Sequence, residues 1–289
     1  MAKERRRSLR QSAGNDDLIS GIYNYCDRWC ERCAFTKRCM LYAQEQEFAA
    51  MDPQAAEARD PNDPKYWGAI AERFMAVRRM IEEDCRERGI DLTLTPEQKH
   101  AIDDSKERRD RKAEADPLSQ SALRYMTSAG DWFKTHRQMF QEKAKDLVAA
   151  AEMELPGADP LAEAADIADA AQVIDWFHMQ IAVKIRRALD GIEREQERLG
   201  DPEDDPFGPD DPELREVMAE AARSDSDGSA KVALVGIDRS IEAWGRLRAR
   251  LPDQADALID TLAHLDRLRR EVEARFPGAR GFKRPGFDE

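Results

Sequence analysis

Long apolar runs are absent from the sequence. No stretch approaches the ~18–20 consecutive apolar residues that a membrane span requires. The basic residues near the N-terminus are not followed by the apolar segment of a secretory signal. Alternation of apolar and polar residues, which is typical of strands, is also missing. We therefore expect a protein that does not associate with membranes and that contains few strands or none.

Basic residues are too few to balance the acidic ones. The chain of 289 residues has 46 Lys and Arg against 59 Asp and Glu, a net charge of −13. This balance disfavours nucleic acid as a partner, because nucleic-acid-binding domains usually carry net positive charge. No Gly-rich phosphate loop and no Ser/His/Asp arrangement is found. Enzymatic activity, substrate and oligomeric state stay open.

Apolar residues at helical spacing predict an all-α fold. Two long helical segments, 116–155 and 159–200, are joined by a short turn, and two more, 224–251 and 252–276, meet at Pro252. Short connections favour antiparallel neighbours. We expect two long helical hairpins that form an antiparallel bundle. The residues expected in its core are Ile174, Ile181, Ile185 and Ala188, then Leu234, Ile237, Ile241 and Trp244, then Leu258, Leu262, Leu265 and Val272.

Changes in composition along the chain predict four parts. Residues 1–15 form a disordered basic tail, and residues 16–50 form a cysteine-rich, metal-binding helical segment packed on the bundle. Residues 64–276 form the helical bundle, beginning with an amphipathic helix that ends at Gly89, and residues 277–289 form an extended tail.

Four of the five cysteines lie in the stretch YNYCDRWCERCAFTKRC, with the spacing C-x3-C-x2-C-x5-C. A helix beginning near Leu18 would place Cys26, Cys30 and Cys33 on one face. The helix would break near Ala34 or Thr36, so that Cys39 folds back as a fourth ligand. Crowded thiolates repel one another, and a bound cation neutralises them. The pattern therefore indicates a metal site, with buried, inert thiols as the alternative.

Two cofactors fit four cysteines. A [4Fe–4S] cluster takes one cysteine at each corner iron, which suits ligands that are spread along a helix. Structural zinc takes four thiolates on one ion, usually from two close pairs separated by a longer spacer. That spacer is missing here, so we favour an iron–sulfur cluster and keep zinc as the alternative. Arg28, Arg32, Lys37 and Arg38 would offset the negative charge of either site.

The motif of Cys26, Cys30 and Cys33 resembles the cysteine motif of radical S-adenosylmethionine enzymes. In that family three cysteines hold a [4Fe–4S] cluster whose open iron binds the cosubstrate. The resemblance would imply a β/α barrel, whereas this sequence shows no alternating strands. Cys39 would also close the open position, so we do not adopt this interpretation.

A second metal site is conceivable inside the bundle. Asp175 and His178 lie three residues apart, and Glu242 and His264 lie on the other predicted helices. This set resembles the di-iron site of ferritin-like proteins only loosely, because the Glu-x-x-His pattern occurs once, with Asp in place of Glu. The simpler interpretation is a core histidine bonded to a carboxylate such as Asp175.

Three functions follow from these patterns. The first is a cytoplasmic iron–sulfur protein for electron transfer or redox sensing, with an unknown redox partner, Cys26, Cys30, Cys33 and Cys39 as ligands, and Trp29 and Phe35 as shields. The second is a non-enzymatic interaction protein with structural zinc and an unknown protein partner. The third is an oxidative di-metal enzyme in the bundle. Clustered cysteines and an odd cysteine count favour a reducing, cytoplasmic compartment.

Overall fold

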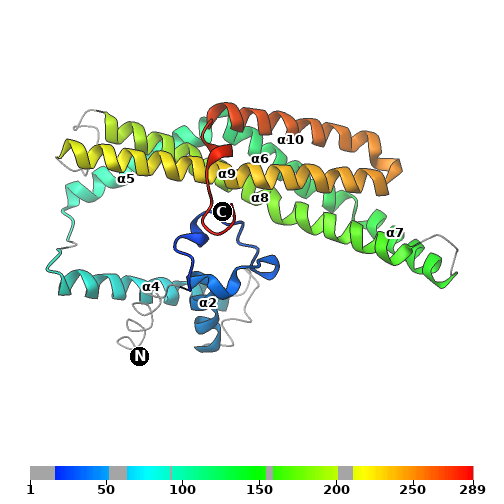
Figure 1. Ribbon diagram of the computed structural model, residues 1–289, viewed down its shortest axis with the longest axis horizontal. Helices are drawn as coiled ribbons and strands as arrows, with labels where there is room; N and C mark the ends of the chain where they lie inside the picture. The colour runs from blue at the N-terminus through cyan, green and yellow to red at the C-terminus, as the bar shows by residue number, and fades with distance from the viewer. Residues whose placement is uncertain (1–16, 52–63, 92, 154–158, 201–210, 289) are drawn as a thin grey trace. The chain divides into compact units, whose positions relative to one another are not determined.

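The computed structural model is helical, and the residues described are 17–51, 64–91, 93–153, 159–200 and 211–288. None of them forms a strand, and no helix among them is both long and apolar enough to cross a membrane. The α-helices are α2 (Met40–Met51), α4 (Pro64–Glu87), α5 (Pro96–Ala115), α6 (Pro117–Thr135), α7 (Arg137–Glu152), α8 (Pro160–Leu199), α9 (Pro212–Arg250) and α10 (Ala255–Arg275) (Figure 1). The 3-10 helices are η1 (Ile22–Asn24), η2 (Cys30–Arg32), η3 (Thr36–Arg38), η5 (Pro252–Gln254) and η6 (Ala279–Gly281). The predicted all-α class is confirmed for this part of the chain.

Two compact units divide the chain. The first contains the described residues up to Asp103 together with residues 284–288, and the second is Asp104–Lys283. The expected division into residues 1–15, 16–50, 64–276 and 277–289 stays a prediction. The packing of the cysteine-rich segment on a bundle stays a prediction. The expected basic tail 1–15 lies outside the described residues.

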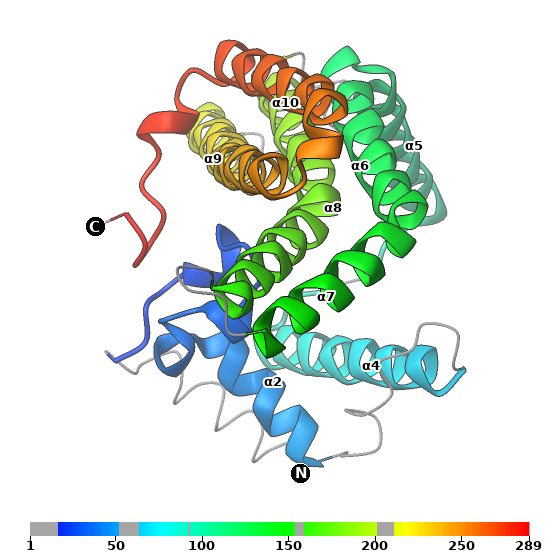
Figure 2. The same cartoon turned by 90° about the vertical axis from the view of Figure 1, so that its right-hand side faces the viewer.

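The second unit is formed around α8 and α9, which run side by side (Figure 1). The helix α6 packs on α8, and α10 packs on both α9 and α6, so the four helices surround one core (Figure 2). Burial of apolar side chains on all four helices is the main force that holds them together. Fully buried residues include Tyr125, Ile174, Ile181, Ile185, Leu234, Ile237, Trp244, Leu258, Leu265 and Val272.

Asp-Pro pairs begin three of the helices. Asp116, Asp159 and Asp211 each precede the first residue of a helix, and each side chain accepts a hydrogen bond from a backbone N–H of the first turn. Proline suits the first helical position because its missing N–H would have no helical partner there. In this chain these Asp-Pro pairs therefore act as N-caps as well as breaks.

The segment 116–155, expected as one helix, is instead two helices that meet at His136. The backbone of His136 (φ −99°, ψ 13°) leaves the α-helical region. Its ring stacks on Trp132 at 4.5 Å, and its Nδ1 lies 2.8 Å from the carbonyl oxygen of Trp132. Helical periodicity does not report such a break, because the aromatic contacts that favour it depend on the fold.

Ion pairs fix the highly charged helix α5 on α8. Arg109 donates hydrogen bonds to Asp190 at 3.0 Å and to Glu197 at 2.8 Å, and Lys112 lies 2.5 Å from Glu193. The side chains of Arg109 and Glu197 are 20% and 16% exposed. This charged segment is therefore a helix that ion pairs attach to α8.

Two further elements differ in part from expectation. The amphipathic helix α4 forms as predicted, but Phe74 and Ile81 on its apolar stripe are 72% and 52% exposed. The segment expected as an extended tail, 277–289, contains η6 and a closed turn in its described part. Ala279 is fully buried, so apolar contacts draw this segment onto the protein instead of leaving it extended.

Candidate functional site

The cysteine segment consists of successive short turns. Among residues 17–39 the structure has η1, η2 and η3 but no α-helix, so the predicted helix with three cysteines on one face is wrong. Gly21 (φ 70°) and Arg28 (φ 59°) adopt left-handed backbone conformations that an α-helix cannot contain. Spacings of three and four residues fit a helix and a series of single turns equally well.

Hydrogen bonds close these turns into a loop. The N–H of Ile19 donates to the carbonyl of Arg38 at 3.0 Å, and the guanidinium of Arg38 donates to the carbonyl of Asp17 at 3.0 Å. Cys39 ends the loop directly before α2, and its carbonyl accepts from Ala43 at 3.1 Å. The predicted return of Cys39 toward the other cysteines thus occurs through η3 and not through the end of a long helix.

All four cysteines line one pocket. Cys26, Cys30, Cys33 and Cys39 are half-buried. Aromatic side chains form much of the remaining wall, among them Trp29, Tyr42 and Phe287. The volume of this cavity is only about 20 Å³, which is enough for about one water molecule. The pocket is therefore narrow, sulfur-rich and mostly apolar.

Polar groups also contact the sulfurs. The N–H of Phe35 donates to Cys33 Sγ at 3.4 Å, and the thiol of Cys26 donates to the carbonyl of Tyr23 at 3.6 Å. Burial raises the pKa of the Cys30 thiol, and the carboxylate of Glu45 raises it further, whereas Arg28 lowers it. The Cys30 thiol therefore keeps its proton to a higher pH than an ordinary cysteine does.

Cationic side chains lie beside this pocket. Arg28 belongs to the pocket wall and pairs with Glu45 at 2.6 Å. The guanidinium of Arg32 lies 4.0 Å from the ring centroid of Trp29, a cation–π contact. Sequence reasoning had identified both arginines as charge-balancing residues. It missed Phe287, because no local pattern relates that residue to cysteines near the other end of the chain.

The described residues contain no single-ion site. No three of their His, Cys, Asp and Glu side chains are arranged to hold one metal ion. Four sulfurs around one zinc ion would lie about 3.8 Å apart, as tetrahedral bonds of about 2.3 Å require. The four cysteines thus share a pocket, while no three ligands among the described residues are arranged for one ion.

The second metal site expected in the bundle is not assembled either. His178 Nδ1 lies 2.7 Å from the carbonyl oxygen of Asp175, on the same helix. His264 Nε2 lies 3.1 Å from both the hydroxyl and the carbonyl oxygen of Ser121, and burial lowers the pKa of this histidine. Glu242 is exposed. Because each histidine ring already bonds to its surroundings, these residues do not form a ligand set.

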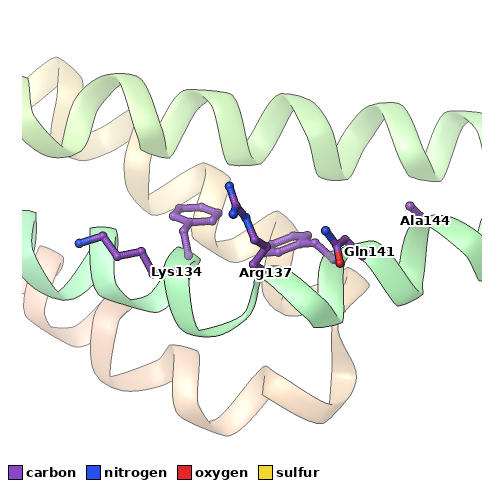
Figure 3. Close-up of a pocket in the computed structure, with 6 residues that line it drawn as sticks. Lys134, Arg137, Gln141 and Ala144 are labelled. Carbon is purple, nitrogen blue, oxygen red and sulfur yellow. The ribbon is translucent and has the colours of Figure 1, made fainter. Parts of the chain in front are cut away.

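A separate groove lies where α6 meets α7. Its volume is about 680 Å³, and Lys134, Arg137, Gln141 and Ala144 border it (Figure 3). The stacked rings of Phe133 and Phe140, 5.8 Å apart, complete its lining. The groove offers no cysteine, histidine or carboxylate, so it holds no metal ligand and no acid–base pair.

The pocket around Cys26, Cys30, Cys33 and Cys39 is therefore the candidate site with the richest chemistry in the described residues. No protein-family model, curated protein or solved structure matches the chain.

Proposed function

We propose that this protein holds a [4Fe–4S] cluster on Cys26, Cys30, Cys33 and Cys39, and that it transfers electrons or senses redox state. One observation carries the proposal. The four thiols line a single pocket, yet no three of them are set around one point. A cluster binds each cysteine at a different iron, so it needs sulfurs that share a cavity but stay farther apart than zinc ligands.

The surrounding residues support this choice of cofactor. The N–H of Phe35 donates to Cys33 Sγ, and such bonds to sulfur are one means by which proteins adjust cluster potentials. Trp29 and Phe287 line the pocket with apolar surface, and Arg28 places a positive charge in its wall. When bound, the cluster supplies reversible one-electron chemistry, and these side chains set its solvent access and local charge.

Loading must widen the pocket. A [4Fe–4S] cluster contains eight inorganic atoms, whereas the space between the side chains accommodates about one water molecule. The proposal therefore requires some of the pocket wall to move outward on binding. Residues on short turns can move at lower cost than residues in packed helices, because they make fewer buried contacts.

We infer that the second unit is an antiparallel helical bundle that acts as a scaffold, and that an unidentified redox protein is the partner. Four free thiols in one pocket favour a reducing, cytoplasmic environment, since crowded thiols oxidise readily elsewhere. We assign no enzymatic reaction.

The direct test is analysis of iron, acid-labile sulfide and zinc in protein purified without oxygen, together with a visible spectrum. We expect iron and sulfide in equal amounts and a brown colour. Replacing Cys30 and Cys33 with serine should abolish the bound iron and sulfide and the brown colour. Cys85→Ser is the matched control, because this cysteine lies in α4 and does not line the pocket.

Other results would exclude the proposal. Stoichiometric zinc without sulfide would instead support the structural zinc site of an interaction protein. Iron that survives loss of the pocket cysteines but not of His178 would favour the di-metal enzyme. Absence of any bound metal, even after anaerobic addition of iron and sulfide, would leave a pocket of inert thiols.

A further inference from the structure

The last residues of the described chain form part of the wall around the cysteines. Phe287 lines the pocket together with all four thiols. Its ring also meets Phe35 edge to face, with centroids 5.1 Å apart and planes at 79°. Aromatic pairs with this geometry attract each other beyond their simple burial. The site is thus assembled from two segments that are separated by almost the whole sequence.

The turn that carries Phe287 is closely seated on the cysteine segment. Gly286 adopts φ +77°, a conformation that other residues rarely tolerate. A Cβ atom at this position would lie 2.8 Å from Cδ1 of Ile19 and 3.2 Å from Cδ1 of Ile22. Ile22 is itself 2% exposed. The contact is close enough that only glycine fits without displacing its neighbours.

An ion pair closes this turn on itself. Arg284 donates two side-chain hydrogen bonds to the carboxylate of Asp288, each 2.9 Å long, and its backbone N–H donates a third at 3.1 Å. The two side chains are only 12% and 21% exposed. The guanidinium also lies 5.0 Å from the ring centroid of Phe287. The turn is therefore a preformed unit that places Phe287, and not a loose chain end.

We propose that residues 284–288 are a removable cover of the cysteine pocket, which controls the access of oxidants and of iron and sulfide to the four thiols. The role in cluster loading and protection rests on the proposed function, whereas control of thiol access does not. The narrow pocket cannot take up a cluster without movement of its wall. The cover meets the cysteine segment through the Phe35–Phe287 ring pair and the contact of Gly286 with the two isoleucines. Its ion pair lies within the turn and keeps the turn intact, so the cover can open as a unit.

Thiol alkylation of the reduced, metal-free full-length protein tests the cover directly. Iodoacetamide labelling, followed by mass spectrometry of the cysteine peptides, gives a rate for each thiol. We expect Phe287→Ala to raise the rates at the four pocket cysteines about 3- to 10-fold, as loss of one aromatic pair implies. Asp288→Asn should raise these alkylation rates less, because the ring of Phe287 remains and only the ion pair between Arg284 and Asp288 is weakened.

Two controls separate opening of the cover from unfolding. Cys85 should react at an unchanged rate in both variants, because it does not line the pocket. Phe74→Ala removes the same side chain from an exposed position in the same unit and should change none of the rates. If Phe287→Ala also raises the alkylation rate of Cys85, this variant has partly unfolded. The rates measured in Asp288→Asn then test the inference instead. If neither variant accelerates the pocket cysteines selectively, the cover does not control access and the inference is wrong.

A second measurement links the cover to the cofactor. In protein loaded with iron and sulfide, Phe287→Ala should lose its visible absorbance in air about 3- to 10-fold faster than the wild type, for the same reason. Equal rates of loss would contradict a protective role. If the wild type takes up no iron and sulfide, the proposed function fails, while the alkylation rates still decide whether the cover exists.

Discussion

Tyr125 is a fully buried phenol in the core of the second unit. Its hydroxyl accepts a hydrogen bond from Trp244 Nε1 at 3.1 Å. Burial raises the pKa of Tyr125 to about 12, because the phenolate would be poorly solvated there. A group that titrates differently in the folded and unfolded states makes stability depend on pH.

Alkaline destabilisation is the expected consequence. The pKa of Tyr125 in the folded protein lies above its ordinary value of 10.0. The contribution of this shift to the free energy of unfolding is therefore fully present below pH 10. Above pH 10 the unfolded chain loses a proton that the folded chain retains, and the free energy of unfolding falls by roughly 2–3 kcal/mol through pH 12.

The variant Tyr125→Phe isolates this effect. At pH 8 it should be less stable than the wild type by about 1–3 kcal/mol, because Trp244 loses its buried acceptor. Between pH 8 and pH 11 the difference should narrow by about 1 kcal/mol, since phenylalanine does not titrate. Urea unfolding of both proteins at pH 8 and pH 11 measures this difference in the free energy of unfolding. If the two proteins showed the same pH dependence, Tyr125 would not be the group that titrates.

Close helix contacts determine the effect of glycine substitutions in α8 and α9. A Cβ at Gly191 would lie 2.8 Å from Cβ and 3.1 Å from Cα of Ser226 on the facing helix. The hydroxyl of Ser226 donates to the carbonyl of Ala188 at 2.7 Å, so these segments approach closely. A Cβ at Gly245 would meet nothing within 4 Å.

Opposite outcomes are therefore expected for two identical substitutions. Gly191→Ala should destabilise the protein by about 1–3 kcal/mol, because overpacking outweighs the gain in helix propensity. Gly245→Ala should stabilise it by about 0.5–1 kcal/mol, because only the propensity changes. Chemical denaturation measures both. Stabilisation by Gly191→Ala would show that α8 and α9 do not pack as described.

The docking of α5 on α8 gives a further test. Arg109 bridges Asp190 and Glu197 on α8, whereas Arg111 pairs only with Glu107 on its own helix, where both side chains are mostly exposed. Arg109→Ala should cost about 1–2 kcal/mol, and Arg111→Ala less than about 0.5 kcal/mol. Urea unfolding at low and high salt measures both. Equal effects would mean that charge does not hold α5 in place.

The whole molecule divides into two units, and only the first contains the cysteine pocket. Replacing Cys26, Cys30, Cys33 and Cys39 together with serine should abolish metal binding. The main helical unfolding transition, followed by circular dichroism, should shift by less than about 2 °C, because the second unit keeps its core. Removal of the proposed metal with a chelator should also shift the midpoint of this transition by less than about 2 °C. A large fall in the midpoint would show that the pocket stabilises the second unit.

Local patterns predicted much of the fold. The apolar spacing of Ile174, Ile181 and Ile185 identified the buried face of α8, and all three are fully buried. The same kind of pattern in α4 predicted the helix but not its exposed stripe. Periodicity reports which face is apolar, whereas burial also requires a partner for that face.

The candidate site was predictable in part. The cysteines were identified by their crowding, and their shared pocket is present. The helix predicted for these cysteines was wrong, because Gly21 and Arg28 adopt left-handed backbone conformations that cysteine spacing does not reveal. The cofactor itself stays a prediction that metal and sulfide analysis will decide.

The sequence by itself determined the helical class of the described residues, the buried face of α8 and the identity of the four candidate ligands. These properties depend on neighbours within a few residues, so local patterns carry them. Only the tertiary structure decided that successive turns surround the thiols and that Phe287 lines the pocket. Those features depend on contacts between distant segments, whose stabilising energy arises only once the chain has folded.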